Sequence, residues 1–387
     1  MSRAERAPLL TGPFLRLWLF SFVTFLSAFQ LFPAIPFRIL ELGGTRAEAG
    51  LFLALYTSCC AVSAPFTGAA ADHFGRRKVL VAGAGVFTLF SLLYGEVTSL
   101  PLLLVVAAVH GVFWSGLLSA SGALMSEVIP VSRRTEGIAW WGLASTAAIA
   151  VAPLVGLTIH RAAGWRTLCL GMAGLSLVMV ALGLRLPVGE PRRTGRFPRL
   201  SEAIDGRVTV AALSLTAMSF GYGGLTSYVA LMSRERGIEP PSLFFTLFAA
   251  SILVTRLFTG RLGDRFGPER LLYPSLAIVP VALLATSFST TRGQLAASAL
   301  LYGVGFGGAY PAFVTWVLGK SAPERRAATF GSILLAFDAG IGLGSVSTGL
   351  VATHLGFTAA FGAGAAVSLL AIPLFLAGGR LLPERTA

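Results

Sequence analysis

Gly68-Ala-Ala-Ala-Asp72-His-Phe-Gly75-Arg76-Arg77-Lys78 is a short basic stretch between two long apolar runs. The same pattern returns once, as Gly260-Arg-Leu-Gly-Asp264-Arg265-Phe-Gly267-Pro-Glu-Arg270. The two Asp residues are 192 positions apart (264 minus 72), which is about half of the 387-residue chain. The repeated stretch indicates a chain built from two related halves.

Other landmarks repeat at the same spacing, without a gap between them. The paired positions are Gly111 and Gly303, Gly116 and Gly308, Arg133 and Arg325, Arg134 and Arg326, and Gly164 and Gly356. Because all of these pairs share one offset, we interpret the sequence as a tandem duplication whose second half superposes on the first.

The composition is that of a membrane protein. The chain is 55% hydrophobic and 12% charged, with a mean hydropathy of +0.77, whereas a soluble domain carries about 25% charged residues. Apolar runs such as residues 79–94 contain no charge, and runs near 20 residues can cross a hydrocarbon core about 30 Å thick. The runs do not alternate apolar and polar residues, so helices are favoured over a barrel.

Twelve apolar spans can be counted, six in each half. The first half gives residues 14–40, 48–71, 79–96, 100–128, 138–160 and 167–187, and the second gives 208–232, 242–262, 270–289, 293–318, 327–351 and 358–379. We therefore predict an all-α polytopic protein with two pseudo-symmetric bundles. The N-terminal bundle covers residues 1–187, a basic cytoplasmic linker covers 188–207, and the C-terminal bundle covers 208–387. An even number of spans places both termini on one side, which we predict to be cytoplasmic.

The chain has a net charge of +13, and its basic residues are distributed as this topology predicts. With a cytoplasmic N-terminus, sixteen Lys and Arg residues fall in the inner loops and seven in the outer loops. This asymmetry is the positive-inside bias of membrane proteins. It accounts for most of the charge, so no nucleic-acid partner is expected.

The chain offers no signal for a metal or a cofactor. Cys59, Cys60 and Cys169 all lie inside apolar segments, without the spacing of a disulfide framework or a metal site. We interpret them as small packing residues. No phosphate-binding loop is present, so direct ATP drive is not expected.

The basic stretch admits two interpretations. Asp72 ends the second span, and its carboxylate can cap a neighbouring helix or pair with a nearby Arg. Such contacts would form a breakable latch that holds only while the cytoplasmic side is shut. Alternatively, the stretch is a turn whose cations set the topology. The second copy at an equivalent position favours the latch.

These residues resemble the loop signature of the major facilitator superfamily, Gly-x-x-x-Asp-basic-x-Gly-basic-basic. Gly68, Asp72, Gly75, Arg76 and Arg77 match it, with a departure at His73. The second copy keeps Gly260, Asp264, Arg265 and Gly267 and departs at Pro268 and Glu269. The resemblance covers the whole chain and implies twelve spans, a small-molecule substrate and no enzymatic activity. It also implies a multi-pass protein of the bacterial inner membrane that works as a monomer.

Within that family the chain resembles the drug:proton antiporter and sugar-efflux-like branch. Ala152-Pro153-Leu-Val-Gly156 is similar to a Gly-Pro-x-x-Gly-Gly motif, which implies a helix bend at Pro153 and Gly156. His110-Gly111 is similar to the end of an Arg-x-x-Gln-Gly motif of proton-coupled members. Ala107 stands where that motif has its Arg, which puts the usual route of proton coupling in doubt.

Two ionisable residues lie deepest within the predicted spans. Asp338 is about 16 Å from the cytoplasmic start of its span at 1.5 Å per residue, and Arg256 is about a turn and a half from the inner end of another. Charges at such depth usually face a cavity or a partner. We predict that Asp338 is a protonation or substrate-cation site and that Arg256 is its partner or part of a cytoplasmic gate. The alternatives are a structural ion pair, or an Arg256 that extends to the inner surface.

His110 is the third candidate for proton or substrate coupling, because histidine titrates near neutral pH. A neutral, hydrogen-bonded packing histidine is the alternative. Several further polar and aromatic residues are candidates for the wall of a central cavity. These are Gln30, Trp114, Tyr222, Tyr228, Tyr302 and Tyr310.

The sequence therefore predicts a secondary active transporter of a small organic solute that works by alternating access. The few charges and several aromatics favour an amphipathic neutral or cationic solute. The motif at Pro153 and Gly156, together with Asp338, favours its export in exchange for protons. The alternative is a facilitator or importer of a sugar-like metabolite, which the missing Arg favours. The four His residues are scattered along the chain, so a membrane enzyme is not expected.

Overall fold

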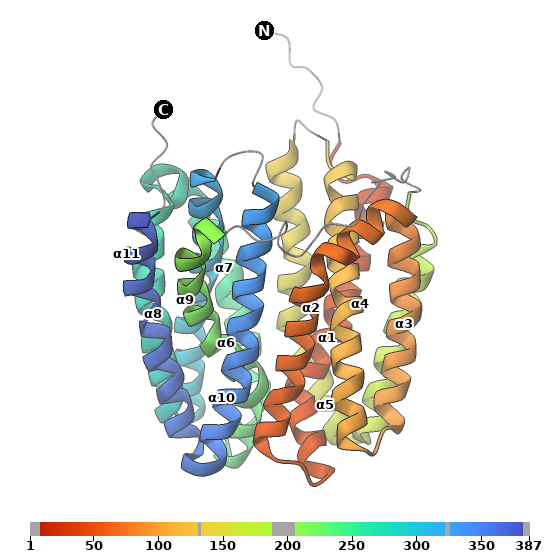
Figure 1. Cartoon of the computed structure of the whole chain (residues 1–387). Helices are drawn as coiled ribbons and strands as arrows, with labels where there is room; N and C mark the ends of the chain where they lie inside the picture. Colours follow the sequence, from red (N-terminus) through yellow and green to blue (C-terminus); the bar gives the residue numbers. More distant parts are fainter. Residues whose placement is uncertain (1–7, 131–132, 188–205, 322–325, 382–387) are drawn as a thin grey trace.

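A computed structural model describes residues 8–130, 133–187, 206–321 and 326–381, and within these ranges the chain is helical. The helices of the first half are α1 (Gly12–Glu41), α2 (Arg46–Phe74), α3 (Arg76–Glu96), α4 (Leu100–Val128) and α5 (Arg134–Gly183). Those of the second half are α6 (Thr209–Glu235), α7 (Leu243–Phe266), α8 (Pro268–Phe288), α9 (Arg292–Lys320), α10 (Arg326–Leu369) and α11 (Ala371–Leu381). Figure 1 shows the two sets side by side as two bundles.

The predicted spans agree closely with these helices. Residues 138–160 and 167–187 were expected as separate spans, and they lie on the two sides of a break in α5 at Gly164 (φ 82°), where the chain turns back. In α10 the chain turns back at Gly356 (φ 80°). Eight helices of the described chain are long and apolar enough to cross a membrane, α5 and α10 among them. The all-helical membrane fold is confirmed, and the exact count of twelve spans stays a prediction.

The backbone repeats at the spacing found in the sequence. Gly75 (φ 94°) ends α2, and its repeat equivalent Gly267 (φ 82°) ends α7. Both residues adopt the left-handed conformation that glycine tolerates without strain. Gly164 and Gly356 form a second pair with positive φ. The duplication inferred from the sequence therefore extends to the turns of the backbone.

Close helix contacts repeat as well. A Cβ added to Gly111 of α4 would collide with the backbone carbonyl of Tyr56 in α2. Its repeat equivalent Gly303 in α9 lies in the same way against Phe248 of α7, and positions 56 and 248 are again 192 apart. Small residues at these crossings let the helix backbones approach closely, as in other membrane bundles.

The start of α1 and the end of α11 lie at the same end of the bundle, which we call the terminal end (Figure 1). The opposite end is closed between the halves. The Arg46 guanidinium donates to the Ala352 carbonyl at 2.7 Å and to Glu235 Oε1 at 2.6 Å. It also lies 4.7 Å over the Phe357 ring. A single arginine at the start of α2 thereby binds α6 and both limbs of α10.

The packing between α2 and α10 continues from this closure to the middle of the bundle. Gly50 lies against the Ser345 carbonyl, and Gly342 lies against Ala54 and Thr57. Towards the terminal end, residues 61–70 of α2 are all half-buried or exposed, whereas Phe52, Tyr56 and Cys60 are buried. The two halves are therefore packed together from the opposite end to mid-depth.

Candidate functional site

Asp338 lies where this packing between α2 and α10 ends. It is 12 residues from the start of α10 (338 minus 326), about 18 Å along the helix. Its carboxyl group is half-buried and lies close to the Cys60 side chain of α2. Tyr56 of α2 and Tyr310 of α9 also lie within electrostatic range of this carboxyl group. Asp338 therefore lies between the two halves, and residues of both surround it.

Arg256 forms a second junction between the halves. Its guanidinium Nη1 donates to Thr146 Oγ1 of α5 at 2.9 Å, and Gly142 leaves room beside it. Among the described residues Arg256 forms no salt bridge with Asp338, although Tyr310 lies within electrostatic range of both. The buried Nε of Arg256 has no hydrogen-bond partner among the described residues. Of the two predicted roles for Arg256, the geometry favours a gate between α5 and α7 over a partner of Asp338.

His110 is fully enclosed within the first half. Its ring is packed by Phe87 and Phe90 of α3 and by Tyr56 of α2, with centroids 4.2, 5.1 and 5.0 Å away. Nδ1 is 3.1 Å from the Tyr94 hydroxyl group, and Nε2 has no partner in the described protein. Among the described residues no hydrogen bond or ion pair joins His110 to Asp338.

The aromatic candidates separate into different environments. Tyr222 is half-buried and stacks on Phe306 at 4.6 Å, while Tyr310 lies 5.0 Å from Phe337, the residue before Asp338. These side chains form an aromatic wall beside Asp338 in the second half. Tyr302 is fully buried behind this wall, and its hydroxyl group has no partner in the described protein.

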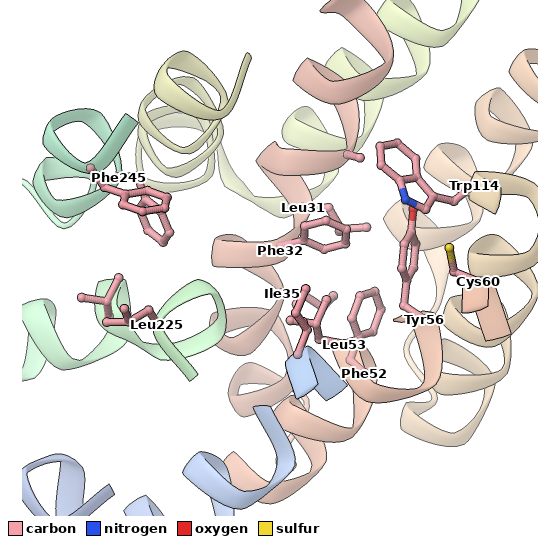
Figure 2. Close-up of a cluster of buried hydrophobic side chains, with 14 of the residues drawn as sticks. Leu31, Phe32, Ile35, Phe52, Leu53, Tyr56, Cys60, Trp114, Leu225 and Phe245 are labelled. Atoms are coloured by element: carbon pink, nitrogen blue, oxygen red, sulfur yellow. The ribbon is translucent and has the colours of Figure 1, made fainter. Parts of the chain in front are cut away.

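Other candidates belong to the packing between the helices. Figure 2 shows Trp114 beside Tyr56 and Cys60, with Phe32 and Leu31 of α1 next to them. Gln30 is buried and donates to the Leu26 carbonyl of its own helix. Tyr228 donates to the Arg46 carbonyl and so belongs to the closure of the opposite end.

The Pro153 and Gly156 segment lies inside α5. The helix keeps helical dihedral angles there, and its only break is at Gly164. A Cβ at Gly156 would lie 2.9 Å from the Gln30 carbonyl oxygen, so Gly156 allows α5 to approach α1. In this conformation the motif provides close packing, and a bend during the transport cycle stays a prediction.

The basic stretch of the first half joins three helices. Arg76 pairs with Asp72 at 3.2 Å, donates to the Ala123 carbonyl at 3.2 Å and forms a salt bridge with Glu127 of α4. Arg77 donates to the Leu184 carbonyl at the end of α5. Gly68 leaves open space beside Ser119. These contacts stay within the first half, and the proposed latch between the halves stays a prediction.

The second copy makes a related contact with the charges exchanged. Glu269 accepts a hydrogen bond from Trp316 Nε1 of α9 and lies 3.7 Å from the Lys320 ammonium group. In the first half the cation Arg76 follows the loop and pairs with Glu127 of α4. In the second half the acid Glu269 follows the loop and pairs with Lys320 of α9. Arg265 is exposed and contacts the neighbouring Phe266 ring at 5.1 Å. Gly260 and Asp264 lie on α7, and the surroundings of their side chains lie outside the described residues.

Sequence reasoning missed three partners of the charged residues: Cys60, Thr146 and Glu127. Thr146 could have been found, because it is the repeat equivalent of Asp338 (338 minus 192). Cys60 and Glu127 carry no such signal. Within the described residues no group of three or more His, Cys, Asp or Glu side chains could hold a metal ion.

Comparison with known proteins gives a consistent result. The sequence profile of the Major Facilitator Superfamily matches residues 17–244 and, in a second match, residues 211–386. The chain is 25% identical over 383 residues to the uncharacterized MFS-type transporter YhhS of Escherichia coli strain K12, covering 95% of this chain and 94% of that protein. It is also 25% identical over 381 residues to YhhS of Salmonella typhimurium strain LT2, with the same coverage.

Two solved structures resemble the fold over nearly the whole chain. A variant of the nucleoside transporter NupG superposes with a TM-score of 0.80 at 14% identity, covering 96% of this chain and all of that one. A variant of the peptide transporter POT superposes with a TM-score of 0.79 at 12% identity, covering 95% and 94%. At these identities the likeness concerns the fold alone.

Proposed function

The chain belongs to the major facilitator superfamily of membrane transporters, and from that premise we propose that it exports a small amphipathic solute in exchange for protons. Its curated relatives are described as transporters, so the chain is a transporter and not an enzyme. Its substrates are small molecules, and it sits in the lipid bilayer. The proposal concerns the direction of transport, the coupling ion and the residues that bind the proton and the solute.

The observation that carries the proposal is the position of Asp338. It is a carboxyl group at mid-depth, at the point where the packing between α2 and α10 ends. In an alternating-access cycle the two halves rock about such a midplane site. A carboxyl group there can release its proton to one side and take up a proton or a cationic solute from the other. An ionisable residue inside a membrane protein usually serves such a pathway, because its burial is costly.

The surroundings of Asp338 indicate the chemistry of the solute. Tyr310, Phe337 and Tyr222 offer aromatic faces, and such faces attract cationic ligands. Arg256 is the guanidinium group near this wall, and it is already bonded to Thr146. A phosphate ester would need several converging cations. We therefore favour a flat, singly charged or neutral organic solute.

The second candidate is a facilitator or importer of a sugar-like metabolite. The specific observation is Ala107, which is fully buried where proton-coupled relatives are expected to have an Arg. With no guanidinium group there, transport would proceed down the gradient of the solute. This candidate predicts that a protonophore has no effect.

We also propose that the terminal end faces the cytoplasm of a bacterial cell and that the monomer is the working unit. Arg76, Arg77 and Lys78 lie at this end, as the positive-inside rule requires. The two related bundles of one chain supply both halves of the rocking unit.

The test is the accumulation of ethidium, a fluorescent lipophilic cation, in cells that express the protein. We expect lower accumulation than in empty cells, and we expect a protonophore or Asp338→Asn to abolish the difference. Glu41→Gln is the matched control, because it neutralises an exposed carboxylate whose partner Arg38 belongs to the same half. Ethidium export that persists with the protonophore would contradict proton coupling.

A further inference from the structure

Two hydroxyl groups of α6 bond the backbone of α10 next to Asp338. Thr216 Oγ1 donates to the Ala336 carbonyl at 2.9 Å. Ser219 Oγ donates to the Phe337 carbonyl, also at 2.9 Å. The Phe337 carbonyl belongs to the peptide bond that joins Phe337 to Asp338. We propose that Thr216 and Ser219 are positioning residues, which fix the height and the rotation of the Asp338 side chain through the backbone of α10.

The surface of α10 admits these two bonds because of a glycine. A Cβ added to Gly340, two residues after Asp338, would collide with the Ser219 hydroxyl group and with the Thr216 carbonyl. The missing side chain lets α6 approach until its hydroxyl groups reach carbonyls of α10, each of which has two lone pairs to share. Both hydroxyl groups also lie near a carbonyl of their own helix, at 3.5 and 3.3 Å. The bond to α10 is the shorter one in each case.

The equivalent positions of the first half are built differently. Thr24 of α1 is the repeat equivalent of Thr216 (216 minus 192), and it donates to the Phe20 carbonyl of its own helix at 2.8 Å. Ala148 of α5 stands at the equivalent of Gly340 (340 minus 192). A hydroxyl group that bonds its own helix fixes nothing on the neighbouring helix. At this pair of positions the bond between the helices therefore belongs to the half that carries the carboxyl group.

The same two bonds orient both parts of the proposed solute site. The Phe337 ring lies 5.0 Å from Tyr310 in the aromatic wall, and the Asp338 carboxyl group projects from the next residue. The titratable and charged groups around this carboxyl group are Cys60 and Tyr56 on α2, Tyr310 on α9 and, beyond Tyr310, Arg256 on α7. A rotation of α10 would change the distance from the carboxyl group to each of them, and with it the free energy of its ionisation.

Hydroxyl groups also hold helices together in membrane proteins without any further role. Ser227 of α6 provides the matched control, because its hydroxyl group bonds that of Ser345 in α10 at 2.7 Å. Ser345 lies seven residues after Asp338 (345 minus 338), about 10 Å along the helix. Ser227→Ala should therefore weaken the packing of α6 on α10 without moving the carboxyl group.

The test is the pH titration of the Asp338 carboxyl group in the purified protein, followed by infrared spectroscopy. The carbonyl band of the protonated carboxyl group is assigned by its loss in Asp338→Asn. We expect Thr216→Val and Ser219→Ala each to shift the titration midpoint by about half a pH unit or more. Ser227→Ala should leave the midpoint unchanged. Thr216→Ser should also leave it unchanged, because it keeps the hydroxyl group, whereas Thr216→Val keeps only the shape of the side chain.

The inference rests on the proposed role of Asp338, but the infrared band does not depend on the solute. An unchanged midpoint in Thr216→Val and Ser219→Ala would overturn the positioning role and leave proton-coupled export untouched. An equal shift in Ser227→Ala would overturn it as well, because the effect would then come from general loosening of the helix pair. Failure of the wild-type protein to export ethidium would contradict the proposed function, and the midpoints would still decide the inference.

Discussion

Asp338 of α10 and Thr146 of α5 occupy equivalent positions in the two halves, 192 residues apart, and each lies beside a side chain of the other half. Asp338 lies close to the Cys60 side chain of α2, and Thr146 Oγ1 accepts a hydrogen bond from Arg256 of α7 at 2.9 Å. Both charged partners belong to the second half, and both neutral partners belong to the first. At these two positions the duplicated interface has thus diverged, because the second half supplies the charged group and the first half supplies its neutral neighbour.

The closure of the opposite end depends on Arg46, and its replacement should open that end. Arg46→Ala removes the bonds to Ala352 and Glu235 and the contact with the Phe357 ring. Spin labels at the exposed positions 99 and 354, one in each half, report the separation. We expect a new population at longer distance in Arg46→Ala.

The matched control is Arg166→Ala, which removes an exposed salt bridge with Glu96 inside the first half. It should leave the distance distribution unchanged. Identical distributions for wild type and Arg46→Ala would mean that Arg46 does not hold the halves together.

The helix crossing at Gly111 should not accept a methyl group. Gly111→Ala places its Cβ against the Tyr56 backbone, and overpacking of this kind costs about 1–3 kcal/mol. Thermal unfolding in detergent, followed by tryptophan fluorescence, should show a lower midpoint. Gly85→Ala is the control, because no atom lies within 4 Å of the added Cβ and the helix gains up to about 1 kcal/mol. Equal midpoints for the two variants would contradict the close crossing of α2 and α4.

The salt bridges of the two loops, Arg76–Glu127 and Glu269–Lys320, can be compared by double-mutant cycles. In the first half, Arg76→Ala and Glu127→Ala should be non-additive by about 1 kcal/mol, since Arg76 is the more buried partner of that pair. In the second half, Glu269→Ala and Lys320→Ala should couple more weakly, because the pair is 3.7 Å apart and Glu269 is half exposed. Stability in detergent gives both values. A stronger coupling in the second half would contradict this order.

Much of the fold could be predicted from the sequence, because it follows from apolar length and from the repeat. Residues 100–128 were expected as a span, and α4 covers those residues. Gly75 and Gly267 were marked by the repeated loop, and both have positive φ because the turn requires it. Asp338 and Arg256 stood out because charges are rare in such segments.

The partners of these charges could not be predicted from the sequence, because they depend on how each helix is rotated about its axis. Cys60 is one of several small residues in an apolar run, and only the packing of α2 on α10 brings it to Asp338. Tyr228 was expected in the cavity wall, and the same kind of packing places it at the closed opposite end. Glu269 departs from the family pattern in sequence, yet it meets Trp316 and Lys320 in space.

The most direct test of the account is proton release by the purified protein when ethidium binds. The protein is placed in weakly buffered detergent solution with a pH indicator, and ethidium is added stepwise while binding is followed by fluorescence. If Asp338 holds the proton that the solute displaces, the wild-type protein should acidify the solution in proportion to bound ethidium, and Asp338→Asn should not. Equal acidification by the two proteins would show that the proton comes from another group.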